Sequence, residues 1–319
     1  MKAVVFDKYG SIDNLRIEEL KKPEPMADEV RLKVFAASVN SGDMQLIRGR
    51  LSARLRSGLF SPGIRVPGID VAGIVDAMGP EAIGCTYGQE VYADLSDYGY
   101  GGFAEYVCVP KSAIALKPGN LSYVEAAAVP MCATAAFQGL LDWGDMLSYR
   151  SVMIIGASGG VGHFAVQIAK NYNLQVTGIT RASNLDFVAG LGADHVKSYD
   201  EIDFNAEDHY ELIFDTVADD SAHKFRNMLT RDGKYVACAF SPTAVIQSPF
   251  GGVLNNRKIV TFDTQPNTDD LATIRKMIEK GNVLPRVDRV FPIEQTVDAL
   301  KYLAEGNANG KVVIKMPDE

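Results

Sequence analysis

Segment 151–170 is the part of this sequence whose residue types and spacing most clearly predict chemistry. An apolar run ends at Ile155, a glycine-rich turn follows, and apolar residues then recur at helical spacing. Such a turn brings backbone N–H groups and a helix N-terminus to a pyrophosphate, because glycine has no side chain to block the approach. The pattern has alanine in the first glycine position of the dinucleotide fingerprint. It predicts a dinucleotide site formed by Ala157, Ser158, Gly159, Gly160, Val161 and Gly162.

The strand expected after this helix bears on the choice between NAD and NADP. Dehydrogenases that use NAD normally place an acidic side chain at the end of this strand, where it binds the ribose 2′-OH. Here no Asp or Glu follows Thr180 until Asp186. Arg181 can pair with a 2′-phosphate, and Thr180 or Ser183 can donate to it. The alternative is that Arg181 is a solvated loop residue.

The elements that position these residues change in character near residue 122. Residues 1–121 contain short strand candidates separated by Gly and Pro, whereas strands and helices alternate from Ser122 onward. Ser122 and Glu125 predict a capping box at the start of this second part. The strand candidates there are 152–156, 174–179, 195–196, 212–215, 235–239 and 259–262. This alternation predicts an α/β doubly wound parallel sheet, and we expect the tail after residue 264 to return to the first domain.

Length and composition limit the classes of partner. The 319 residues are enough for about two domains, and the net charge of −8 argues against nucleic acid or an anionic membrane as partner. No apolar run approaches the roughly 18 residues of a membrane span, and residues 1–6 resemble a strand rather than a signal peptide. Scattered cysteines predict reduced thiols, not disulfides or a metal site. We therefore expect a soluble cytoplasmic protein.

Several motifs in this sequence resemble those of medium-chain dehydrogenases/reductases. They begin at Gly68, Gly101, Ala126, Gly156, Leu191 and Gly310, and the resemblance covers essentially the whole chain. The branch that they resemble most is the zinc-independent quinone oxidoreductase, or ζ-crystallin-like, group. The resemblance implies a β-rich GroES-like substrate domain from residues 1–121 and 265–319. It also implies a Rossmann NADP-binding domain at 122–264 and an active site in the cleft between the two.

The residues in the places of the family's zinc ligands predict a metal-free protein. Zinc-dependent members bind a catalytic zinc through Cys, His and a further Cys or acidic residue. Here Asn40 stands in the place of the first Cys, and Gly68-Ile69-Asp70 stands in the place of Gly-His-Glu. The side chain of Ile69 cannot ligate a metal. The four-cysteine lobe that binds structural zinc in the family is missing as well.

The resemblance assigns further cofactor residues and favours NADP(H). Thr134 matches the family's threonine near the nicotinamide, with a hydroxyl bonded to the preceding helical turn as the alternative. The family lines its cofactor groove at the carboxyl ends of strands, and the matching residues here are Tyr199, Ala239, Phe262 and Thr264. For Tyr199, packing is an equally good interpretation.

Without zinc, the predicted reaction is hydride transfer from the nicotinamide to a quinone or an α,β-unsaturated carbonyl. These acceptors are already electron-poor, so positioning and one hydrogen bond to the developing negative oxygen suffice. Asn40 is the candidate for that hydrogen bond. Asp43 matches an acidic residue of the same family loop, with capping of a helix at 44–48 as its alternative role. Tyr92 is a candidate for the cleft, with packing as its alternative.

Two other functions remain open on the sequence alone. One is an alcohol dehydrogenase or aldehyde reductase of the same superfamily. The other is a non-enzymatic NADPH-binding sensor, because no residue stands out as a general acid.

Two further patterns concern charge and assembly. No acidic residue occurs between Asp43 and Asp70, and the arginines in this segment are Arg48, Arg50, Arg54, Arg56 and Arg65. They predict either steering of anionic substrates or of the NADPH phosphates, or a solvated helix face. The apolar strand candidate 259–262 would be the edge of the parallel sheet and predicts a homodimer.

Overall fold

The computed structural model describes residues 1–204, 209–218, 222–238 and 258–317. The chain divides into two compact units. Unit 1 contains residues 1–131, 266–279 and 285–319, and unit 2 contains residues 132–265 and 280–284. The expected boundary at residue 121 is too early, because helix α3 (Tyr123–Ala127) contacts strands β3 (Glu29–Ser38) and β4 (Asp70–Met78) of unit 1.

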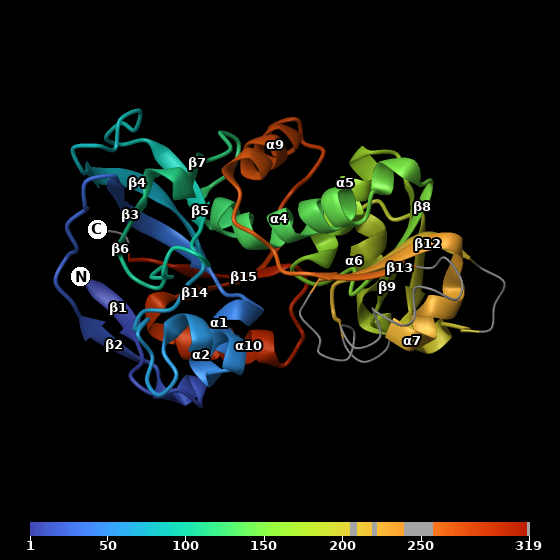
Figure 1. The fold of residues 1–319 in the computed structure, drawn as a ribbon, viewed down its shortest axis with the longest axis horizontal. Helices are drawn as coiled ribbons and strands as arrows, with labels where there is room; N and C mark the ends of the chain where they lie inside the picture. The colour runs from blue at the N-terminus through green and yellow to red at the C-terminus, as the bar shows by residue number, and fades with distance from the viewer. Residues whose placement is uncertain (205–208, 219–221, 239–257, 318–319) are drawn as a thin grey trace. The chain divides into compact units, whose positions relative to one another are not determined.

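Unit 1 is built on a seven-stranded sheet in the order β14-β15-β3-β4-β5-β7, with β6 also paired to β3. Its remaining strands are β5 (Glu90–Asp94), β6 (Tyr106–Pro110), β7 (Ile114–Leu116), β14 (Val287–Pro292) and β15 (Lys311–Lys315). Strand β15 pairs antiparallel with β3, with Ile314 opposite Ala37. Figure 1 shows the red C-terminal strands among the blue N-terminal elements. The tail of the chain therefore completes the sheet that the first residues begin.

Unit 1 also contains a two-stranded sheet and further helices. These elements are β1 (Lys2–Val5), β2 (Arg16–Glu19), α1 (Ser41–Arg48), α2 (Leu51–Ser57), α9 (Thr268–Glu279) and α10 (Thr296–Ala304). Alternate residues of β3 point into the hydrophobic core of unit 1. They pack there with residues that are distant in sequence, such as Leu46, Phe103 and Ile314. Ser122 and Glu125 form the expected capping box, with N–H to side-chain distances of 2.8 and 3.3 Å. The chain then enters α4 (Pro130–Gln138), within which unit 2 begins.

Unit 2 is a six-stranded, all-parallel sheet in the order β10-β9-β8-β11-β12-β13. Its strands are β8 (Ser151–Ile155), β9 (Gln175–Thr180), β10 (His195–Ser198), β11 (Tyr210–Asp215), β12 (Leu229–Cys238) and β13 (Lys258–Phe262). Its helices include α5 (Gly162–Asn171), α6 (Leu185–Gly190) and α7 (Ala222–Phe225). This order confirms the expected doubly wound fold, whose ligands bind at the carboxyl ends of β8 and β11, where the strand order reverses.

The buried strands of unit 2 explain why the sequence forms a covered parallel sheet. Residues Val152, Met153 and Ile154 of β8 have no exposed surface, as expected for a strand covered on both faces. The helix expected at 221–229 is shorter in the structure. Helix α7 ends at Phe225, and a 3₁₀ turn then leads into β12 at Leu229. Within the described residues, no helix has both the length and the apolar character needed to cross a lipid bilayer.

Candidate functional site

The glycine-rich turn joins β8 to α5 and is fastened to the neighbouring strand β9. The carbonyl of Ile179 accepts hydrogen bonds from the N–H groups of Gly156 (3.0 Å) and Ala157 (2.9 Å). A Cβ on Gly162 would lie 2.1 Å from the carbonyl oxygen of Gly156, so the first residue of α5 must be glycine. This close approach of turn and helix is the role of the third glycine in the dinucleotide fingerprint. The local geometry therefore fits a pyrophosphate at the N-terminus of α5.

A buried hydrogen-bond network supports this turn from the end of β9. The hydroxyl of Ser158 accepts from Thr180 Oγ1 (2.8 Å) and from Asn184 Nδ2 (3.2 Å). The Ser183 hydroxyl donates to Asn184 Oδ1 (3.0 Å). The hydroxyl protons of Thr180 and Ser183 are thus used inside the protein, which differs from their expected donation to a 2′-phosphate. Arg181, in contrast, is exposed.

Thr134 is a fully buried residue of α4. Its Oγ1 forms no hydrogen bond in the part of the chain that the structure describes. The alternative interpretation, a hydroxyl bonded to the preceding helical turn, is therefore wrong. Buried hydroxyls are normally hydrogen-bonded, and leaving one unsatisfied destabilises a protein by about 1–3 kcal/mol. An amide group of a ligand, such as a nicotinamide carboxamide, is the kind of partner that this oxygen lacks.

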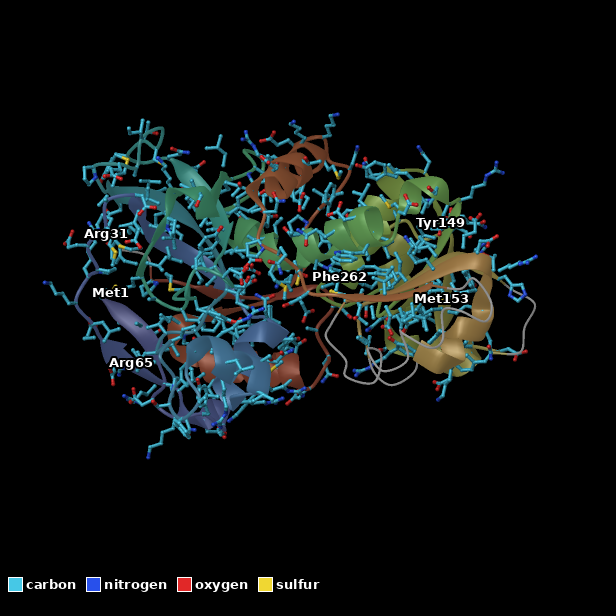
Figure 2. All side chains as sticks on the ribbon, viewed as in Figure 1. Met1, Arg31, Arg65, Tyr149, Met153 and Phe262 are labelled. Carbon is cyan, nitrogen blue, oxygen red and sulfur yellow. The ribbon has the colours of Figure 1, made fainter. Side chains whose placement is uncertain are left out.

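The remaining cofactor candidates have different surroundings. Phe262 is buried and stacks on Trp143 and Phe214, with ring centroids 6.0 and 6.4 Å apart, so most of its ring belongs to the core. It lies at the end of β13 (Figure 2). Tyr199 follows β10 and is 38% exposed. Thr264 is half-buried, and Ala239 lies outside the described residues.

Unit 1 contains a buried polar cluster around Asp70, which we call the Asp70 cluster and define as Ser38, Asn40, Asp70 and Lys311. Asp70 Oδ2 accepts from Ser38 Oγ (2.8 Å) and Asn40 Nδ2 (2.9 Å), and it lies 3.3 Å from Lys311 Nζ. Asp70 Oδ1 accepts from the N–H of Met131 in α4 (2.8 Å). The Lys311 ammonium also donates to Asn40 Oδ1. The cluster connects the end of β3 with the first residues of β4 and β15. The sequence motifs did not predict the contact between Lys311 and Asn40.

The Asp70 cluster changes the interpretation of Asn40. Its Nδ2 donates to Asp70 and also to the carbonyl of Ser38 (3.3 Å), while its Oδ1 accepts from Lys311. Both amide hydrogens and the amide oxygen therefore have partners inside the protein. Asn40 is 3% exposed, so this geometry is that of a residue that organises the site. A donor to substrate must come from elsewhere.

Asp43 and Asp94 are two buried carboxyl groups close to this cluster. Asp43 accepts from the N–H groups of Asn40 (2.9 Å) and Gly68 (3.0 Å), so it fastens the start of α1 to the segment before β4. Its expected alternative role in helix capping is thus present, although α1 begins at Ser41. Burial raises the pKa of Asp43 to about 8. Burial, with the charge of Asp70 in addition, raises the pKa of Asp94 to about 7, and Asp94 Oδ2 has no hydrogen-bond partner among the described residues.

Two sequence candidates of unit 1 have structural partners. Tyr92 is fully buried, and its hydroxyl donates to the carbonyl of Leu271 (2.8 Å), which matches the packing alternative. In the arginine segment, Arg54 donates to the carbonyls of Gly49 and Leu59, at 2.7 and 2.9 Å. Arg56 pairs with Asp97 at 3.5 Å, and Arg65 (Figure 2) pairs with Asp7 and Glu18 at 2.9 and 3.4 Å. These three arginines therefore have protein partners within unit 1, and the steering and solvated-face interpretations both stay predictions.

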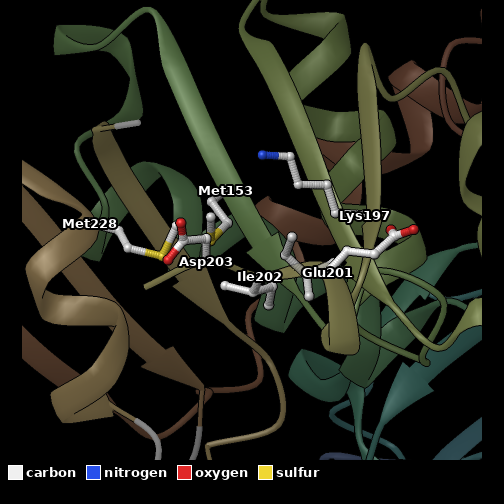
Figure 3. Close-up of a pocket in the computed structure, with 7 residues that line it drawn as sticks. Met153, Lys197, Glu201, Ile202, Asp203 and Met228 are labelled. Atoms are coloured by element: carbon white, nitrogen blue, oxygen red, sulfur yellow. The ribbon is translucent and has the colours of Figure 1, made fainter. Parts of the chain in front are cut away.

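A small cavity in unit 2 is lined by none of the sequence-predicted site residues. It is lined by Met153, Ile179, Lys197, Glu201, Ile202, Asp203 and Met228 (Figure 3). Its volume of about 50 Å³ is far below the roughly 300–1,000 Å³ of ligand pockets, so it is too small for a dinucleotide or a substituted quinone. Among the residues that the structure describes, no group of three or more His, Cys, Asp or Glu side chains could hold a metal ion.

Comparison with known proteins identifies the family. The model for the alcohol dehydrogenase GroES-like domain matches residues 26–119, and the model described as zinc-binding dehydrogenase matches residues 191–314. A 2-methylene-furan-3-one reductase of Solanum lycopersicum is 32% identical, over 98% of this chain and 79% of the relative. An NADPH-dependent alkenal/one oxidoreductase of Arabidopsis thaliana, described as chloroplastic, has the same identity and coverage.

Solved structures agree with this assignment. The quinone oxidoreductase from Coxiella burnetii matches with a TM-score of 0.90 and 27% identity, over 99% of both chains. The chain therefore belongs to the quinone oxidoreductase-like branch of the medium-chain dehydrogenase/reductase superfamily, and it is an oxidoreductase with a nicotinamide cofactor site in its Rossmann unit.

Proposed function

We propose that this protein reduces quinones or α,β-unsaturated carbonyl compounds with NADPH and without a metal ion. Bound NADPH supplies the hydride, and the protein binds and orients the cofactor and the acceptor. The observation that carries this proposal is the Asp70 cluster. The family's metal-ligand places hold the alkyl side chain of Ile69, the fully bonded amide of Asn40, and Asp70 paired with the Lys311 ammonium. An acceptor that is already electron-poor needs no metal to polarise it.

The preference for NADPH is supported by the end of β9. Arg181 is exposed there and no carboxylate precedes Asp186, which suits a ribose that bears a 2′-phosphate. The relative from Arabidopsis is described as NADPH-dependent. Thr134 and the turn 156–162 provide the residues that would bind the nicotinamide and the pyrophosphate. Asn184, which the sequence did not single out, supports this turn through Ser158.

The position of the transferred hydride tests the acceptor class. The experiment uses NADPH deuterated at C4 and 3-penten-2-one, and the product is analysed by NMR. We expect deuterium on the β-carbon of the saturated ketone. Deuterium on the carbonyl carbon would indicate the alcohol dehydrogenase or aldehyde reductase alternative. Tight NADPH binding without reduction of either this enone or 1,4-benzoquinone would support the sensor alternative.

We further propose a homodimer that forms through strand β13. In the described part of unit 2, β13 is paired on one side only, with β12, and its residues Ile259 and Val260 are half-buried. An apolar edge strand favours pairing with a second copy. Light scattering that gives the monomer mass at assay concentration would refute this proposal.

The proposed cytoplasmic location rests on the cysteines. The cysteines are widely scattered in the sequence and form no CxxC pair, which favours a reducing compartment; they are Cys85, Cys108, Cys132 and Cys238. Relatives are described as chloroplastic or mitochondrial, so fractionation of cells that produce the native chain is the required measurement.

A further inference from the structure

Tyr100 has a backbone conformation that is unusual for its residue type. Its φ is +63°, and its two neighbours, Gly99 and Gly101, also have positive φ angles of +90° and +102°. Glycine adopts this region freely, whereas a bulky side chain is strained there. Strained residues of this kind cluster at functional sites. Glycine would form this turn without strain, so the presence of tyrosine at position 100 suggests a role for its side chain.

The loop that bears Tyr100 is held rigidly next to the Asp43 carboxyl group. The N–H groups of Tyr98 and Tyr100 both donate to the carbonyl of Leu95, at 3.0 and 3.1 Å. Farther along, the N–H of Gly102 donates to the carbonyl of Gly68 (3.0 Å), whose own N–H donates to Asp43 (3.0 Å). This chain of hydrogen bonds connects the loop to α1 and to the segment that leads into β4. The strained residue is thus fixed to the elements that form the Asp70 cluster.

The hydroxyl of Tyr100 is available as a donor. Its ring packs against the core of unit 1 and is half-buried, but its hydroxyl forms no hydrogen bond in the part of the chain that the structure describes. Tyr92 donates to Leu271 and Tyr123 donates to Glu90, so the hydroxyls of these two tyrosines are already bonded.

The charges around Tyr100 keep its proton in place. Burial, followed by the charge of Asp43, raises the pKa of this hydroxyl above its ordinary value, and Asp94 and Asp97 act in the same direction. Arg56 opposes this effect, and Arg56 itself pairs with Asp97. The hydroxyl therefore remains a donor throughout the neutral pH range. A carbonyl oxygen, which only accepts hydrogen bonds, is the complementary ligand group.

We propose that the Tyr100 hydroxyl donates a hydrogen bond to the carbonyl oxygen of the enone or quinone, a role for which the Asn40 amide has no free hydrogen. This inference rests on the proposed function. For an enone, the hydride adds to the β-carbon, the C=C electrons shift toward the carbonyl carbon, and the C=O electrons move onto oxygen. The α-carbon then takes a proton from water. Tyr100 keeps its proton and stabilises the negative oxygen.

The test compares Tyr100→Phe with Tyr98→Phe, which makes the same chemical change in the same loop at an ordinary backbone conformation. Removal of a donor to a developing oxyanion is expected to lower kcat for 3-penten-2-one about 100-fold in Tyr100→Phe, with the Kd for NADPH unchanged. The Tyr98→Phe variant is expected to match the wild type. Both variants should fold, because only one oxygen atom is lost in each.

A spectroscopic measurement separates substrate contact from a merely structural role. Infrared difference spectra are recorded for ¹³C-carbonyl-labelled 3-penten-2-one bound to the enzyme–NADP⁺ complex. The wild type should lower the carbonyl stretching frequency, and Tyr100→Phe should abolish that shift. An unchanged frequency and kcat in Tyr100→Phe would overturn this inference. A wild-type protein that reduces neither pentenone nor 1,4-benzoquinone would instead contradict the proposed function.

Discussion

Lys311 and Asp70 form an ion pair in which Nζ lies 3.3 Å from Oδ2 and both side chains are at most 2% exposed. The pair connects the first residue of β15 with the first residue of β4, so it fastens the C-terminal tail to the N-terminal sheet. It also places a fixed positive charge beside the Asn40 side chain.

Lys311→Met is expected to destabilise the protein by about 3–5 kcal/mol, because it leaves the Asp70 carboxylate buried without its counter-charge. Urea unfolding monitored by circular dichroism measures this change. The double variant Asp70→Asn/Lys311→Met should recover much of the loss, since no buried charge remains. Lys301→Met, which removes an exposed ion pair with Asp13, is the matched control and should change little. A loss in Lys311→Met no larger than the control's would contradict the assignment of a buried charge pair.

Asp94 makes stability depend on pH in a defined direction. Its pKa of about 7 in the folded protein exceeds the ordinary value of 3.8, so the folded state binds the proton more tightly than the unfolded state. Stability from this group is full below about pH 3.8 and is lost as the pH rises toward 7.

In the wild type, the Asp94 carboxyl should lower the free energy of unfolding by up to about 1.4 kcal/mol for each pH unit between pH 5 and pH 7. The Asp94→Asn variant should lack this contribution. The measurement is the free energy of unfolding at both pH values for wild type and variant. Equal slopes in the two proteins would show that the Asp94 carboxyl does not hold its proton in the fold.

Thr134→Val tests the unpartnered hydroxyl. Because Oγ1 has no hydrogen bond in the described structure, its removal should leave the melting temperature of the cofactor-free protein unchanged or higher. Loss of one hydrogen bond to the nicotinamide carboxamide should raise the Kd for NADPH about fivefold. Fluorescence titration and thermal unfolding on the same samples provide both numbers. A Thr134→Val variant that is destabilised but has an unaltered Kd for NADPH would indicate that Thr134 has a structural role only.

Arg181→Ser should raise the Kd for NADPH about tenfold to a hundredfold and leave the Kd for NADH unchanged, since the loss concerns the 2′-phosphate alone. Titration of both cofactors against wild type and variant is the measurement. Arg231→Ser removes another exposed arginine of unit 2 and serves as the control for net charge. If Arg181→Ser raises the Kd values for NADPH and NADH equally, this arginine does not bind the 2′-phosphate.

The fold was largely predictable because its signals are local. Strand, glycine turn and helix follow one another between Ser151 and Asn171, and β9, α6 and β10 continue this alternation. Strand β14 was missed because most of its side chains are exposed and show no apolar alternation. It forms by pairing with β15, which is a tertiary effect.

The site was predictable only where the sequence itself brings residues together. The turn 156–162 is such a case, whereas the partners of Asn40 come from β4 and β15, and no spacing rule relates Asn40 to Lys311. The same holds for Tyr100. Two flanking glycines indicate a turn, but only the structure shows that the tyrosine between them has a positive φ.

The most direct test of this account compares NADPH and NADH oxidation with 1,4-benzoquinone and 3-penten-2-one, with and without a metal chelator, by absorbance at the reduced nicotinamide band. We predict turnover that prefers NADPH and is unaffected by the chelator. Turnover that the chelator abolishes and that added zinc restores would contradict it.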